Sequence, residues 1–294
     1  MSARASRGRP SVIWMGSKPG SVVCLDEALR RGWRVEAVVV SPTVGHPWAS
    51  GPSLADFARE RGLPVMVQAE LPAGARADFV VSYMYRHRVL PRVLGMATRA
   101  AVNFHAGPLP RFGGWAFYNV AILEDAAEYG CTCHHMDDGF DTGPLVRVRT
   151  FPIAAESETA VSLERKAQRE MVRLFLEFCE LAEGGGELPR EPQDPRAMRY
   201  LSKQEFERLK EIPPGSDAVA ADRRARAFWY PPYECAYVTV GGKRLQVVPD
   251  LVKQELARGA HAGDYDDLLA VARTARASRP RPSRADDRDA REEP

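Results

Sequence analysis

The sequence has few cysteines and no long apolar run, and each shortage excludes a class of protein. Its five cysteines are an odd number and form no Cys-x-x-Cys pair, so a disulfide framework is not expected. No stretch of about 18 apolar residues is present to span a bilayer, and the basic N-terminus lacks the apolar segment of a signal peptide. These absences predict a cytoplasmic protein in a reducing compartment.

A strong excess of one charge is also missing. The 41 basic and 39 acidic side chains leave a net charge of +2. Much of the arginine lies near the two termini, in residues 1–10 and 273–291, so the remaining chain is close to neutral or mildly acidic. This balance disfavours a protein that binds a phosphate backbone, which needs a local basic patch.

Short apolar runs alternate with amphipathic segments, and this alternation predicts an α/β fold. The runs are apolar throughout, as expected for strands buried on both faces. We expect a Rossmann-like parallel sheet with flanking helices, a mixed edge and a small C-terminal β-hairpin module. The expected strands are 11–15, 35–40, 65–67, 79–83, 101–104, 130–135 and 145–151, and the expected helices are 21–33, 54–61, 162–182, 203–211 and 216–227.

Composition divides the chain into five expected parts. A two-residue glycine turn, Gly241-Gly242, between two alternating runs predicts the hairpin of the C-terminal part. The parts are a disordered leader (1–10), a main catalytic domain (11–186), a linker with a short helix (187–212), a small α/β module (213–272) and a disordered tail (273–294).

The densest group of polar functional side chains lies between Asn103 and Asp141. Asn103 and His105 are two residues apart at the end of an expected strand, so their side chains share one face. In open parallel sheets, ligands bind at the carboxyl ends of strands. Such a trio suits acyl transfer to nitrogen: an amide donor for the oxyanion, an imidazole for the proton and a carboxylate to orient it. On spacing alone, a core histidine and a turn-capping aspartate stay open alternatives.

A metal site is a second interpretation of the same region. Cys131, Cys133 and His135 would share one strand face, next to His134. Structural zinc sites usually have Cys-x-x-Cys spacing in two knuckles, which is absent here. We therefore expect no metal.

Several separated motifs closely resemble the folate-dependent formyltransferases. They are Asn103-Phe104-His105-Ala106-Gly107-Pro108-Leu109-Pro110, Gly113-Gly114, Asn119-Val120-Ala121-Ile122, Gly130-Cys131-Thr132-Cys133-His134 and Asp141-Thr142-Gly143. The resemblance covers roughly residues 11–180. It implies that Asn103, His105 and Asp141 are catalytic and that the formyl donor is 10-formyltetrahydrofolate.

The resemblance also implies where the substrates bind. The donor would be held by two segments, which comprise Tyr83, Met84, Tyr85 and Arg86 and then Asp137, Asp138 and Gly139. His134 matches a family histidine near the site, with either a structural or a direct role. Gly107 stands where many members have serine. Trp115 and Tyr118 follow the Gly-Gly pair, and we expect them to stack on a ligand ring or to pack in the core.

The segment 226–234 and the hairpin after it look like the C-terminal part of the nucleotide-sugar N-formyltransferases. We therefore expect a nucleotide-linked amino sugar, or a similar small amine, as acceptor, and a possible homodimer. Methionyl-tRNA formyltransferase is the alternative, disfavoured because residues 41–53 contain no lysine or arginine and little ordered chain follows Pro213. A formyltetrahydrofolate hydrolase and a non-catalytic folate or nucleotide binder also stay open.

Overall fold

The computed structural model of the chain describes residues 9–41, 51–260 and 270. The expected leader and tail lie almost wholly outside this range, as do residues 42–50 of the segment without lysine or arginine. Backbone contacts divide the chain into two compact units, Met1–Val248 and Pro249–Pro294. The domain boundaries expected from composition stay predictions.

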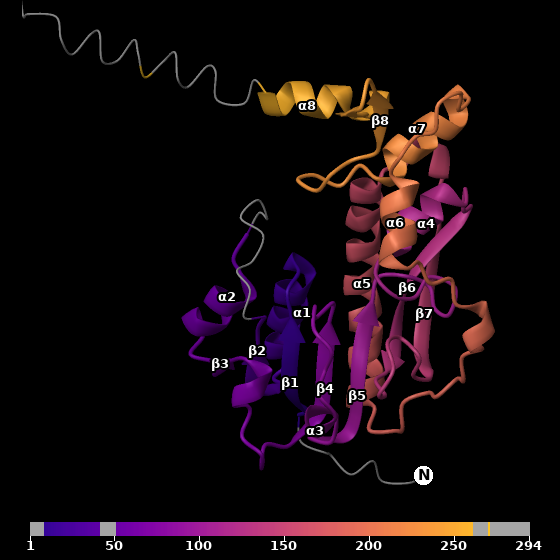
Figure 1. Ribbon diagram of the computed structural model, residues 1–294. Coiled ribbons are helices and arrows are strands. Elements are labelled where there is room, and N and C mark those ends of the chain that lie inside the picture. The colour runs from indigo at the N-terminus through magenta and orange to yellow at the C-terminus, as the bar shows by residue number, and fades with distance from the viewer. Residues whose placement is uncertain (1–8, 42–50, 261–269, 271–294) are drawn as a thin grey trace, which may run out of the picture. The chain divides into compact units, whose positions relative to one another are not determined.

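A seven-stranded mixed sheet organises the first unit (Figure 1). Its strands are β1 (Ser11–Gly16), β2 (Arg34–Val39), β3 (Val65–Met66), β4 (Ala77–Tyr83), β5 (Ala97–His105), β6 (Glu128–His135) and β7 (Leu145–Pro152). In the order β3-β2-β1-β4-β5-β6-β7, the first five strands are parallel and the last two are antiparallel to their neighbours. The α/β fold with a mixed edge is thus confirmed.

The apolar strand sequences are explained by burial on both faces of this sheet. β1 alternates its side chains between two hydrophobic clusters, with Val12 and Trp14 in one and Ile13 and Met15 in the other. All four side chains are inaccessible to solvent. Each such side chain contributes roughly 1.5–3 kcal/mol when it is fully buried, so these positions of β1 do not tolerate a polar residue without a partner.

Helices pack on both faces and complete the first unit (Figure 1). They are α1 (Pro19–Arg30), α2 (Leu54–Glu60), α3 (Pro91–Leu94), α4 (Phe117–Leu123), α5 (Ala160–Glu183), α6 (Lys203–Leu209) and α7 (Ala218–Ala227). α5 begins with a capping box in which Thr159 and Ser162 bond each other's backbone N–H. Its Phe175 packs edge-on against Trp14 of β1 and Phe104 of β5. This packing holds one face of β5 in place, and with it the residues on the opposite face of the same strand.

The expected hairpin is present as β8 (Tyr237–Val240) and β9 (Lys243–Gln246), joined by Gly241-Gly242 with both glycines at positive φ. The short helices α3 and α4 were not predicted. α4 has only seven residues and no side-chain cap at its start, so its sequence carries neither a long period nor a start signal. The second unit contains α8 (Lys253–Ala260). Within the described residues, no helix is both long and apolar enough to cross a membrane.

Candidate active site

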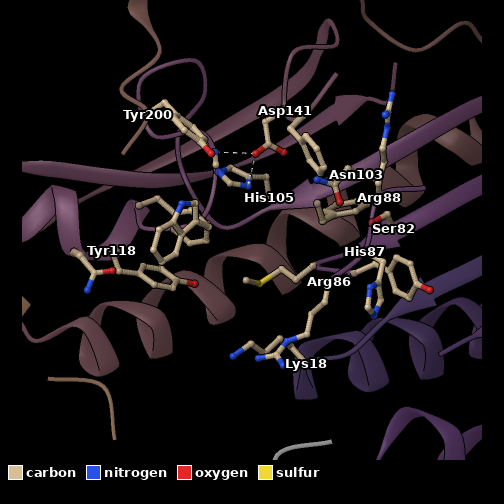
Figure 2. A pocket seen from close by; sticks show the side chains of 18 of the residues that line it. Lys18, Ser82, Arg86, His87, Arg88, Asn103, His105, Tyr118, Asp141 and Tyr200 are labelled. Atoms are coloured by element: carbon tan, nitrogen blue, oxygen red, sulfur yellow. Dashed lines mark hydrogen bonds and ion pairs between the residues drawn. The ribbon is translucent and has the colours of Figure 1, made fainter. Parts of the chain in front are cut away.

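A cavity of about 870 Å³ opens beside the carboxyl ends of β4 and β5. The strand wall of this cavity comes from strand ends, the chain between β4 and β5, and the loop between β6 and β7; it comprises 82, 84–89, 94, 103–105, 134, 136, 137 and 139–141. The helix wall comes from helices and the C-terminal part of the unit; it comprises 18, 114, 115, 117–119, 164, 200, 206, 207, 210, 228, 230, 233 and 234. Figure 2 shows His105 and Asp141 between the two walls.

Asn103 projects from β5 beside His134, its direct cross-strand partner on β6. The Asn103 Nδ2 lies 3.1 Å from His134 Nε2, and His134 Nδ1 lies 2.8 Å from the carbonyl of His135. Because a carbonyl only accepts, Nδ1 of His134 carries a hydrogen, and Nε2 faces both the Asn103 amide and Asp141 Oδ1. The His134 ring thereby holds the Asn103 side chain in place at the cavity.

His105 stands at the end of β5 with both ring nitrogens placed by neighbours. Its Nε2 donates to the carbonyl of Phe112 at 2.7 Å, and its Nδ1 faces Asp141 Oδ2 at 3.6 Å. The ring packs edge-on against Phe117, with centroids 4.7 Å apart. Since Phe112 holds the hydrogen on Nε2, Nδ1 is the basic atom of the neutral ring, and a proton gained there would lie next to a carboxylate.

Asp141 is held in a left-handed backbone conformation with φ of 58°. Its Oδ2 accepts from the Gly114 N–H at 3.0 Å, and its Oδ1 lies 3.5 Å from His134 Nε2. Burial raises the pKa of this carboxyl, but the His105 and His134 rings and the Gly114 N–H outweigh burial and hold the pKa well below its usual range. The site therefore keeps a negative charge at neutral pH.

Gln193 fixes the loop that carries Asp141. Its Nε2 donates to the carbonyl of Asp141 at 2.9 Å and to that of Gly143 at 2.6 Å. Gln193 lies in the segment expected as a linker, and this segment pairs with β7 through a bridge between Glu191 and Leu145. Sequence reasoning missed Gln193 because its amide N–H groups bond backbone carbonyls, which leave no side-chain pattern.

The structure brings together most of the residues expected to hold the donor. Met84, Tyr85 and Arg86 line the strand wall with Asp137 and Gly139. Asp137 Oδ1 also shapes the loop, because it accepts from the Gly139 N–H at 2.9 Å and the Thr142 hydroxyl at 2.7 Å.

Tyr83 and Asp138 are not among the lining residues. The Tyr83 side chain is fully buried and stacks on Phe104 in the core, with centroids 5.9 Å apart. The Asp138 carbonyl accepts a hydrogen bond from the guanidinium of Arg88. The role of these two residues in donor binding stays a prediction.

The expected acceptor residues divide in the same way. Trp115 and Tyr118 line the helix wall, whereas Gly107 does not line the cavity. A Cβ on Gly107 would lie 2.5 Å from the Phe112 carbonyl oxygen and 2.9 Å from His105 Nε2. Glycine is thus required here to let the Phe112 carbonyl reach His105. The serine of other family members has no room on this loop path.

An ionic cluster of the helix wall was also missed from the sequence. The Lys18 ammonium donates to Glu164 Oε1 at 2.8 Å and to the Tyr230 hydroxyl at 3.0 Å, and Tyr230 hydrogen-bonds Glu164 as well. The three residues lie far apart in the chain, and no local motif connects them.

The residues considered for a zinc site have other surroundings in the structure. Burial raises the pKa of Cys131 to about 12, and His135 bonds the Pro189 carbonyl and Arg190. Burial also lowers the pKa of His135. Across residues 9–41, 51–260 and 270, no group of three or more His, Cys, Asp and Glu side chains is arranged to hold a metal ion.

Comparison with known proteins agrees with this geometry. Residues 55–178 match the family model described as formyl transferase. A methionyl-tRNA formyltransferase of Myxococcus xanthus is 33% identical over 257 residues, which are 81% of this chain and 78% of that protein. The chain belongs to the formyltransferase family. This formyltransferase is also 30% identical over 191 residues to a GDP-perosamine N-formyltransferase of Brucella melitensis, covering 65% and 71% of the two chains.

A solved structure has the same fold as this formyltransferase. It is an N-formyltransferase of Helicobacter canadensis in complex with folinic acid and dTDP-3-aminofucose, with a TM-score of 0.68 and 20% identity over 81% of this chain and 86% of that one. The relatives thus include enzymes named for tRNA and enzymes named for nucleotide sugars, and the family by itself leaves the acceptor of this formyltransferase open.

Proposed function

We propose that this formyltransferase moves a formyl group from 10-formyltetrahydrofolate to the amine of a nucleotide-linked amino sugar. The observation that carries the proposal is the set of Asn103, His105 and Asp141 between two unlike walls of one cavity (Figure 2). A cavity of about 870 Å³ is within the usual range for a small-molecule site. One wall would hold the donor and the other the acceptor.

The strand wall suits the folate donor. Met84, Met136 and Phe140 offer apolar surface, and Arg86 and Arg88 bring positive charge to the same wall. A folate has a flat heteroaromatic ring at one end and carboxylates at the other, so this combination matches both ends. The Helicobacter canadensis enzyme was solved with the folate folinic acid, which supports the choice of donor.

The helix wall suits a sugar nucleotide. Trp115 and Tyr200 line the cavity while 45% and 59% of their surfaces stay exposed, and the Trp115 ring is held in place by a hydrogen bond to the Leu201 carbonyl. Exposed aromatic rings beside a pocket can stack on a base. The names of the Brucella melitensis and Helicobacter canadensis proteins support this acceptor class.

The proposed mechanism uses the atoms as the structure places them. The neutral amine attacks the formyl carbon, a new C–N bond forms, and the bond from that carbon to N10 of the folate breaks. Asn103 donates an amide N–H to the oxyanion. His105 takes the amine proton on Nδ1, Asp141 at 3.6 Å stabilises the imidazolium, and the proton then passes to the departing folate nitrogen.

An absorbance assay for tetrahydrofolate release tests the proposal. The protein would be mixed with 10-formyltetrahydrofolate and, in separate reactions, GDP-perosamine, dTDP-3-aminofucose, initiator methionyl-tRNA or buffer alone. We expect release that depends on a nucleotide sugar. Release only with the tRNA, release in buffer alone, and no release in any reaction would each overturn the proposal; the first two would indicate translation initiation and a hydrolase.

Two histidine variants make the assay specific to this site. His105→Ala should abolish release, because the base is lost. His135→Ala is the matched control, since His135 contacts Pro189 and Arg190 and does not line the cavity.

The proposal also includes the expected cytoplasmic location and homodimer. Cell fractionation tests the location, and size-exclusion chromatography tests the homodimer.

A further inference from the structure

Tyr118 has a buried hydroxyl group without a partner. The residue belongs to α4, is only 6% exposed, and lines the cavity. Among the described residues, no atom forms a hydrogen bond with its hydroxyl oxygen. Buried polar atoms without partners are rare in folded proteins because they lose water and gain nothing in return.

Two other buried or half-buried tyrosines, one in the core and one at the cavity, do have partners. The Tyr129 hydroxyl donates to the Ala106 carbonyl at 2.9 Å, and the Tyr230 hydroxyl accepts from Lys18. The rings of Tyr118 and Tyr129 contact each other, with centroids 5.9 Å apart. Of these two neighbouring buried tyrosines, the fold uses the hydroxyl of Tyr129 and leaves that of Tyr118, which lines the cavity, unused.

The unused hydroxyl is a hydrogen-bond donor. It faces the side of the cavity where we propose that the amine substrate binds. Burial and the nearby Glu164 carboxylate raise the pKa of Tyr118, so the phenol keeps its proton. In the view of Figure 2, the hydroxyl points from α4 toward the middle of the cavity. Tyr118 and Tyr200 lie there on one side of His105, with Asn103 and Ser82 on the other.

We propose that the Tyr118 hydroxyl donates a hydrogen bond to an oxygen atom of the amine substrate and so helps to select it. The inference rests on the proposed function, in which that oxygen is a sugar hydroxyl near the reacting amine. Binding selects the conformers in which the side chains around Tyr118 leave its oxygen open to the cavity. A substrate without such an oxygen leaves the buried hydroxyl unpaired. Its binding is then disfavoured, because a buried donor without a partner costs free energy.

The variants Tyr118→Phe and Tyr129→Phe test this inference, because each removes one oxygen atom from the same aromatic cluster. For wild type and both variants, we would measure the melting temperature and the kinetic constants for GDP-perosamine, dTDP-3-aminofucose and 10-formyltetrahydrofolate. Tyr118→Phe should melt at or above the wild-type temperature, lower kcat/KM for the sugar by about 10- to 100-fold, and leave KM for the folate within about twofold.

Tyr129→Phe should behave in the opposite way. It leaves the Ala106 carbonyl without its donor, so it should lower the melting temperature and leave KM for the sugar unchanged. A Tyr118→Phe variant that melts below wild type, that keeps the wild-type sugar kinetics, or that loses folate affinity equally would overturn the inference.

Failure of the proposed function gives a different result. If wild type releases tetrahydrofolate only with methionyl-tRNA, the sugar proposal is wrong, and Tyr118→Phe is compared with wild type on that acceptor. If no acceptor works, the melting temperatures still decide whether the fold needs the Tyr118 hydroxyl, and a destabilised Tyr118→Phe overturns the inference there too.

Discussion

The strand wall and the helix wall of the cavity differ in how their polar groups are held. In the strand wall, Asn103, His105 and Asp141 are each fixed by neighbouring imidazole or backbone groups at defined distances. The helix wall combines exposed aromatic rings with ion pairs and the unpaired hydroxyl of Tyr118. The difference suggests that the reaction is set by the rigid wall and the choice of amine by the other. Changes in the strand wall should then lower kcat for every acceptor, and changes in the helix wall should alter KM for the acceptor alone.

The largest effect is expected for Asp141→Asn. The variant keeps an acceptor for the Gly114 N–H but removes the charge that stabilises protonated His105. We expect kcat to fall by about 10²- to 10⁴-fold, the range of general acid–base contributions, with KM for 10-formyltetrahydrofolate changed only a few-fold. Steady-state kinetics with either nucleotide sugar measure this. Wild-type turnover in the variant would remove Asp141 from the mechanism.

The same carboxylate should make stability depend on pH. Because the pKa of Asp141 is lower in the folded protein than in the unfolded chain, the unfolded chain binds more protons in acid and stability rises with pH. This contribution is fully present above the unfolded pKa of about 3.9 and is lost as pH falls toward the folded value. Each pKa unit corresponds to about 1.4 kcal/mol. Urea unfolding from pH 3 to 7 should show a stability difference between wild type and Asp141→Asn that shrinks in acid; a constant difference would contradict it.

A smaller effect is expected for Gln193→Ala. Without the amide, the carbonyls of Asp141 and Gly143 lose a donor, and the loop positions Asp141 less well. We expect kcat to fall by about tenfold for any acceptor, because small misplacements of reacting groups are costly, with KM values little changed. Arg190→Ala is the matched control, since Arg190 lies in the same segment and contacts His135 instead. A change confined to acceptor KM would place Gln193 with the helix wall.

The smallest effect is expected for Tyr200→Ala. This exposed ring in the helix wall should contribute stacking alone, so KM for the nucleotide sugar should rise by about 3- to 10-fold, roughly 1 kcal/mol. Stability should change by less than about 0.5 kcal/mol, as is usual for exposed positions. Phe140→Ala, a similarly exposed ring in the strand wall, should change KM for the folate instead. If both variants affected the same substrate, the division into two walls would be wrong.

The sequence predicted the parallel core well because buried strands carry their signal locally. Apolar runs such as 79–83 lie in strands that are covered on both faces, and the Gly241-Gly242 turn by itself indicates a hairpin. α4 was missed because seven residues without a cap show no clear helical period. Its position matters, since α4 carries Phe117 against His105 and Tyr118 at the cavity.

Part of the site was also predicted because its signal in the sequence is local. Asn103 and His105 share a strand face, which period-two spacing predicts, and the structure adds that His134 faces Asn103 across the strand pair. Contacts made through space had no signature in the sequence. Gln193 bonds backbone carbonyls, and Lys18 meets Glu164 from another part of the chain. Only the folded arrangement could identify them.

The ionic cluster of the helix wall has a consequence for the growing chain on the ribosome. Lys18 and Tyr230 are 212 positions apart, so their contact forms only when the C-terminal part of the first unit has been made. Chains generally begin to fold from the N-terminal side during synthesis. The segments that carry Asn103, His105 and Asp141 are therefore made early, and the helix wall of the cavity is completed last.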